Sequence, residues 1–190
     1  MAAQAFRPAT QGQLRDWLEG HGVPTAPYGQ GPTKSLEHLL TEVLDGESTL
    51  GLDAGGQPQR RVSVVSVEIR DARGRTLIEA RQVLPSGAQR ARALPLSEKL
   101  LPGEAWEAAA VRGVREELAS VLPPSPQISI KTESHTMTED RRPSLSYPGL
   151  ATCYICHRVE AEVQGLPSEA FRTEEQRPDG ILTAFWEWII

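Results

Sequence analysis

Residues 94–122 read LPLSEKLLPGEAWEAAAVRGVREELASVL, and this stretch decides how the rest of the chain is interpreted. A loop closes at Pro102-Gly103, and an uninterrupted run of helix-forming residues follows it. Residues three and four apart share one face of a helix, so positions 112, 113, 116 and 117 should gather on one side. Paired glutamates beside a glycine-containing loop offer the oxygen ligands that divalent cations prefer. The charged residues expected on this helix are Glu104, Arg112, Glu116 and Glu117, and its expected apolar stripe is Ala105, Ala108, Ala109, Ala110, Val111, Val114 and Leu118.

The spacing of these residues resembles a Nudix box. That pattern is Gly, five residues, Glu, seven residues, Arg-Glu-aliphatic, one residue, Glu-Glu, one residue, Gly, aliphatic. Laid on the chain without a gap, it matches at Glu104, Arg112, Val114, Glu116 and Glu117. It departs at Glu98 and Ala119, where glycine is usual, at Gly113, where glutamate is usual, and at Ser120, where an aliphatic residue is usual.

The resemblance implies an α/β fold, a Nudix-like α/β/α sandwich with a mixed β-sheet. It also implies a hydrolase that uses Mg²⁺ or Mn²⁺ to cleave a diphosphate linkage in a nucleotide-like or phosphorylated small molecule. Carried over by position, Glu116 and Glu117 would be the principal metal ligands, with Glu104 as an outer member of the cluster. Arg112 would hold a box glutamate, and the backbone carbonyl of Ser97 would donate to the metal.

The departures from the box leave more than one function open. Gly113 removes a carboxylate that normally contributes to the metal site, and Glu98 could supply a substitute from the loop. The first class is therefore a metal-dependent hydrolase that uses Glu104, Glu116, Glu117 and a substitute acid. The second is a catalytically silent Nudix-fold protein that binds a ligand or a protein partner. The third is an ordinary amphipathic helix, since glutamates with an arginine four residues earlier are common on solvated helix faces.

Other candidate residues lie in segments expected to be loops. Arg141, Arg142 and Tyr147 could grip phosphate and stack on a base, or they could simply keep a polar loop soluble. Glu174, Glu175 and Asp179 could add a further acid to the site, or they could be solvated loop residues. His135, at the end of one expected strand, and His157, on another, have no metal-ligand partners at a convincing spacing, so no role is assigned to them.

Composition limits the class of protein. The 190 residues suit one domain with an extension, and the net charge of −5 argues against general binding to nucleic acid or to an anionic membrane surface. No apolar run approaches the roughly 20 residues of a membrane helix. The start of the chain lacks the apolar core of a secretory signal, so we expect a cytoplasmic location and leave an organellar one open. Cys153 and Cys156 are three apart on an expected strand, which points them to opposite faces and argues against a shared metal.

The expected organisation is an N-terminal helical extension over residues 1–58 and a Nudix-like domain over 59–190. Periodicity predicts two helices in the extension, at 11–20 and 34–44. They could be a cap that packs on the sheet, or a surface for a homodimer or protein partner. Strands are expected at about 62–69, 76–84, 127–134, 151–163 and 181–190, with 89–94 either a third strand or an arm, and a long polar loop at 135–150.

Overall fold

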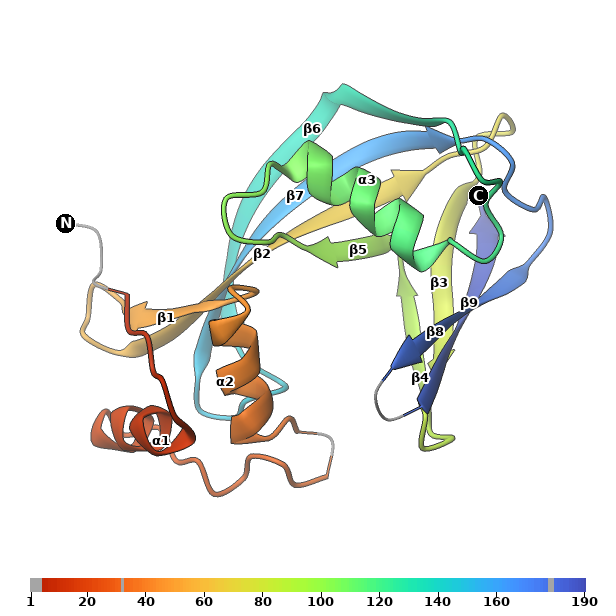
Figure 1. Ribbon diagram of the computed structural model, residues 1–190. Coiled ribbons are helices and arrows are strands. Elements are labelled where there is room, and N and C mark those ends of the chain that lie inside the picture. The colour runs from red at the N-terminus through yellow and green to blue at the C-terminus, as the bar shows by residue number, and fades with distance from the viewer. Residues whose placement is uncertain (1–4, 32, 178–179) are drawn as a thin grey trace. The chain divides into compact units, whose positions relative to one another are not determined.

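The computed structural model describes residues 5–31, 33–177 and 180–190, and in these residues it has three helices and two β-sheets (Figure 1). The helices are α1 (Gln11–Gly20), α2 (Leu36–Leu44) and α3 (Trp106–Glu117). Both N-terminal helices lie where periodicity predicts them. None of the helices in the described part of the chain has the length and apolar character that a membrane span requires.

The strands of the described residues form two sheets rather than the single mixed sheet that the sequence predicts. The five-stranded sheet has the order β1-β2-β7-β6, with β5 also paired to β2. The four-stranded sheet has the order β4-β3-β9-β8, and its neighbours are antiparallel. The strands are β1 (Thr49–Leu52), β2 (Pro58–Ile69), β3 (Thr76–Val83), β4 (Gln89–Leu94), β5 (Leu96–Lys99), β6 (Ile128–Pro143), β7 (Ala151–Val163), β8 (Phe171–Arg177) and β9 (Gly180–Ile189).

The division into two sheets begins at the turn over residues 71–75. The turn itself is as predicted, because Asp71 and Arg75 close it with a backbone hydrogen bond of 3.0 Å. Only one bridge, between Arg70 and Thr76, then joins the two flanking segments. From there β3 pairs with β4 and β9 instead of returning along β2. The segment at 89–94 is therefore a strand, which the sequence left open as either a third strand or an arm leading into the box.

Strand β6 is longer than predicted. The sequence suggests that the strand ends at residue 134 and that a polar loop fills 135–150, but β6 continues to Pro143. Residues 136–143 are exposed, so they show none of the apolar alternation by which a strand is recognised. Only the loop at 144–150 remains between β6 and β7.

The chain divides into two compact units, and strands β2, β5, β6 and β7 contribute to both. The first unit comprises residues 1–64, 99–104 and 138–156, and the second comprises 65–98, 105–137 and 157–190. In the first unit, Thr10 and Ser35 cap α1 and α2 by accepting backbone N–H groups through their hydroxyls. Leu14 and Leu18 of α1 and Leu36 and Leu39 of α2 are buried inside this unit, whereas Leu44 at the end of α2 is exposed. The core cluster consists of Leu14, Leu18, Val23, Leu36, Leu39, Leu50, Tyr147 and Leu150.

A buried carboxylate lies beside this core. Glu42 on α2 is 6% exposed and forms ion pairs with Arg60 at 2.5 Å, Lys34 at 2.6 Å and Lys99 at 3.2 Å. Burial alone raises the pKa of Glu42, but the three cations outweigh burial and bring the pKa down to about 2. The carboxylate therefore stays ionised and ties α2 to β2 and to residue 99.

The second unit contains α3 and the four-stranded sheet. Trp186 on β9 is buried, and its indole N–H donates to the Thr173 hydroxyl on β8 at 2.9 Å. Figure 1 shows α3 running alongside β5, and contacts of Gly113 with Leu96 and Glu98 agree with this placement. The segment that resembles the Nudix box thus forms a strand, a turn and a helix.

Candidate functional site

The helix of the box segment begins later than the sequence suggests. Glu104 was expected on the helix, but α3 starts at Trp106, and Glu104 belongs to the turn before it. Its carboxylate accepts the backbone N–H of Leu101 at 2.9 Å. Glu104 lies in the first unit, whereas Glu98, Arg112, Glu116 and Glu117 lie in the second.

The buried side of α3 differs from the predicted stripe. Ala105 and Ala108 are exposed, and Gly113 takes a place in the buried row. The helix carries Glu107 in its first turn and Arg115 in its last, which suits the helix dipole. The buried residues of this side are Ala109, Ala110, Gly113, Val114 and Leu118.

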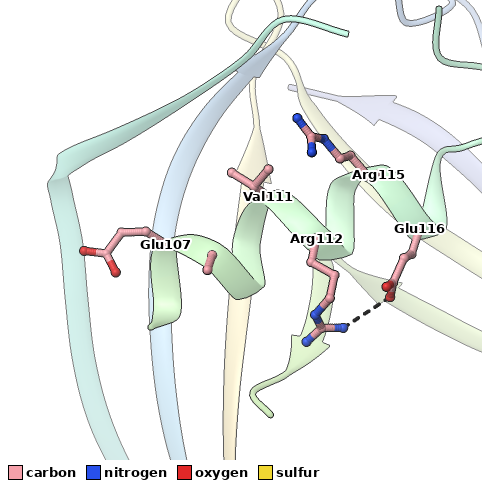
Figure 2. A pocket seen from close by; sticks show the side chains of 6 residues that line it. Glu107, Val111, Arg112, Arg115 and Glu116 are labelled. Atoms are coloured by element: carbon pink, nitrogen blue, oxygen red, sulfur yellow. Dashed lines mark hydrogen bonds and ion pairs between the residues drawn. The ribbon is translucent and has the colours of Figure 1, made fainter. Parts of the chain in front are cut away.

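Arg112 connects Glu98, which lies on β5 and not in the expected loop, to Glu116 on α3. Its Nη1 lies 3.2 Å from a carboxylate oxygen of Glu98 and 3.2 Å from one of Glu116. The two oxygens are therefore at most twice that distance apart. Figure 2 shows the Arg112 side chain turned toward Glu116, one helical turn away. The sequence prediction that positions 112 and 116 share a face is confirmed.

Gly113 lies directly against Glu98. A Cβ atom on Gly113 would be 2.8 Å from Cβ of Glu98 and 3.1 Å from its Cγ. The first distance is shorter than real Cβ contacts, so any side chain at 113 would require β5 or α3 to shift. The side chain at 98 therefore requires glycine at 113, because its Cβ leaves no room for another.

The two remaining box residues, Glu117 and Ser97, lie on α3 and β5. Glu117 is half-buried at the last position of α3 and has an interaction partner. Ser97 is exposed on β5, and its hydroxyl donates to the Pro95 carbonyl at 3.1 Å. No three His, Cys, Asp or Glu side chains within the described ranges are grouped closely enough to hold a metal ion.

An open depression of about 590 Å³ runs along the exposed face of α3. In Figure 2, Glu107 and Arg115 point away from the pair formed by Arg112 and Glu116. The ion pair of Arg112 and Glu116 therefore lies in the C-terminal half of the helix, apart from Glu107 in its first turn. The residues that line the depression are Glu107, Ala108, Val111, Arg112, Arg115 and Glu116.

The predicted substrate-binding residues are not together in one loop. Arg141 and Arg142 are exposed on β6 and form ion pairs with Glu139 at 2.7 Å and Asp140 at 3.4 Å. Tyr147 is fully buried in the core of the first unit, where it packs beside Tyr28. Its ring thus serves core packing in this structure.

The later acidic candidates lie on β8 or beyond what is described. Glu174 and Glu175 are exposed on that strand, and Glu174 lies 3.7 Å from Arg172. Asp179 falls outside the described residues.

Cys153 and Cys156 are both free on β7, which spans the residues predicted for it.

A cluster that the sequence did not reveal surrounds Trp106. Its ring stacks on His135 with centroids 4.0 Å apart, and His135 Nε2 lies 3.0 Å from His157 Nδ1. Burial, and then the neighbouring His135, lower the pKa of His157. These residues come from α3, β6 and β7, so sequence spacing carries no signal of their contact.

No protein-family model matches the chain, and no curated protein matches it.

Proposed function

We propose that the protein is a Nudix-type, metal-dependent hydrolase that cleaves a diphosphate linkage in a nucleotide-like or phosphorylated small molecule. The proposal includes a Nudix-like domain over residues 59–190 and a two-helix extension before it. It rests on the gap-free spacing of the box residues and on one geometric observation. That observation is the arrangement of Glu98, Arg112 and Glu116 around Gly113.

Glu98 and Gly113 exchange the two residue types that a Nudix box would place at these positions. The box has glycine before the helix and glutamate on the helix, whereas this chain has glutamate on β5 before the helix and glycine on the helix. The Glu98 side chain occupies the space beside Gly113, and its carboxylate reaches Arg112. A carboxylate missing from the helix is thus supplied from β5. This exchange supports a retained acidic site over a lost one.

The donor atoms suit Mg²⁺ or Mn²⁺, which bind carboxylate oxygens. Mg²⁺ keeps several of its waters and needs only one or two protein carboxylates together with substrate phosphates. In the proposal Glu116 and Glu117 are the principal metal ligands, and Glu98 on β5 is the substitute acid beside them. No three of these carboxylates are grouped closely enough in the described residues to hold the metal by themselves, so waters and substrate phosphates would complete its coordination. A bound metal would offset phosphate charge and lower the pKa of a coordinated water. Arg112 orients the carboxylates of Glu98 and Glu116 through charge-assisted hydrogen bonds.

The test is hydrolysis of a panel of nucleoside diphosphate derivatives with Mg²⁺ or Mn²⁺. Glu117→Gln and Glu98→Gln should each lower kcat by about 100-fold, in the range of lost acid–base or metal-orienting groups. Glu107→Gln is the matched control, because Glu107 is exposed on the same helix and points away from Arg112. Activity that survives both substitutions would refute the site.

The second candidate is a catalytically silent Nudix-fold binding module. It is favoured by Arg112, whose guanidinium already neutralises the carboxylates of Glu98 and Glu116. A silent protein should show no heat of Mg²⁺ or Mn²⁺ binding in calorimetry and no activity on any member of the panel. The hydrolase should show heat of metal binding and activity on at least one member of the panel.

A further inference from the structure

Three aromatic side chains meet where the start of α3 lies beside β6 and β7 (Figure 1). Trp106 is the first residue of α3, His135 lies on β6 and His157 lies on β7. The centroid of the Trp106 ring is 4.0 Å from that of His135 and 6.4 Å from that of His157. The three ring planes are within 19° of parallel. All three residues are half-buried, and all three belong to the second unit.

A hydrogen bond joins the two imidazoles, and it limits the number of protons that they can hold. Nε2 of His135 lies 3.0 Å from Nδ1 of His157. One of these nitrogens must carry a hydrogen and the other a lone pair, because a neutral imidazole has one donor and one acceptor. A first added proton leaves the bond in place, since the cationic ring still donates to the neutral one. A second added proton makes both nitrogens donors, so that two hydrogens and two like charges face each other.

The surroundings of the pair oppose that second proton. Burial is the largest cause that lowers the pKa of His157, and the neighbouring His135 is the next. The carboxylate of Glu107, in the first turn of α3, acts in the opposite direction and is the smallest of the three effects. Along β6 the nearest charged residue is the exposed Glu133, and along β7 it is Arg158, which already forms an ion pair. The doubly protonated pair is therefore disfavoured while the two rings stay in contact.

The first turn of α3 lacks a support that the other two helices of the described residues have. Thr10 and Ser35 cap α1 and α2 through their hydroxyls, whereas the N-cap residue of α3 is Ala105, whose side chain makes no hydrogen bond. A missing side-chain cap weakens the start of a helix. The stack of Trp106 on His135 joins this uncapped turn to β6. Loss of the stack should therefore loosen the start of α3 before the rest of the helix.

We propose that the pair of His135 and His157 is a pH-sensitive latch for the first turn of α3. In the closed latch the imidazoles share their hydrogen bond and the Trp106 ring stays against β6. In the open latch both imidazoles are protonated, the rings separate, and Trp106 is released with the start of the helix. Because the pKa of His157 is lowered from its ordinary 6.5, the latch is closed above pH 6.5 and opens as the pH falls below that value. The latch is independent of the proposed hydrolase, because it uses none of the box carboxylates.

The test is amide hydrogen exchange of the full chain at pH 8 and pH 5, followed by NMR and corrected for the exchange rate of an unstructured peptide at each pH. Protection at residues 109–112 of α3 should fall by about tenfold at pH 5, which corresponds to a tenfold difference in proton affinity between the closed and open latch. Protection along β9 should not change. In the same titration the indole N–H signal of Trp106 should shift with the midpoint of the His157 ring signals, below pH 6.5.

Two variants separate the latch from a general effect of acid. His157→Asn removes one of the two charges, so residues 109–112 should keep their protection at pH 5. His38→Asn changes an exposed histidine on α2, and this matched control should lose protection as the wild type does. An equal loss of protection in wild type and His157→Asn would overturn the proposal. A wild-type Trp106 signal that does not follow the His157 titration would also overturn it, and this measurement decides the matter even if His157→Asn does not fold.

Discussion

Replacing Gly113 with alanine should destabilise the protein, although alanine is the better helix former. In the interior of α3 the change from glycine to alanine by itself favours folding by about 1 kcal/mol. The new Cβ, however, would lie 2.8 Å from Cβ and 3.1 Å from Cγ of Glu98, and 3.3 Å from a methyl group of Leu96. The Cβ of Glu98 is attached to the backbone of β5 and has no rotamer that moves it away.

The net magnitude follows from these two opposing effects. Forcing an extra methyl into a filled space typically costs about 1–3 kcal/mol. Subtracting the helix preference leaves a net destabilisation of about 1 kcal/mol for Gly113→Ala. In a Glu98→Gly background the closest contacts are gone, so the same substitution should stabilise the protein by about 1 kcal/mol.

The assay is urea unfolding, monitored by circular dichroism, of the four proteins of a double-mutant cycle: wild type, Gly113→Ala, Glu98→Gly and the double mutant. The coupling free energy between positions 98 and 113 should be about 2 kcal/mol, which is within the range for residues in contact. Gly20→Ala is the control, because nothing lies within 4 Å of a Cβ at the end of α1. A Gly113→Ala change that stabilises the protein equally in both backgrounds would refute the steric dependence of Gly113 on Glu98.

Three other predictions concern stability. Glu42→Gln should cost about 3 kcal/mol at pH 7, because Arg60 is left buried without its partner. Because the pKa of Glu42 is about 2 in the folded protein, its ion pairs stabilise the fold fully above pH 4.5, and this stabilisation is lost as the pH falls toward 2. Urea unfolding should therefore show a smaller difference between Glu42→Gln and wild type at pH 3 than at pH 7. The pKa of His157 is lowered in the folded protein, so the imidazole binds a proton more readily in the unfolded chain than in the folded one. The Tm should therefore fall as the pH drops below 6.5, and it should fall less steeply in His157→Asn. Gly46→Ala should destabilise by more than about 2 kcal/mol in urea unfolding, through its clash with Pro102 and its positive φ, and an unchanged midpoint would contradict the packing of Gly46 against Pro102.

Local periodicity was sufficient for the elements whose burial pattern repeats along the chain. The helices at Gln11–Gly20 and Leu36–Leu44 and the strand at Ala151–Val163 could be predicted because their apolar residues recur at helical or strand spacing. The same reasoning failed for residues 135–143 of β6, whose side chains are largely exposed. There the strand exists because it pairs with β7, and pairing leaves no mark in the residue types.

The sequence by itself determined the spacing of Glu104, Arg112, Glu116 and Glu117 and the shared face of positions 112 and 116, because both depend on residues close together in the chain. The tertiary structure alone decided that Glu98 fills the space beside Gly113, that Tyr147 is buried, and that Trp106, His135 and His157 lie in contact. Each of these contacts joins separate elements, and the packing of those elements depends on the whole fold. No local pattern of residues contains that information.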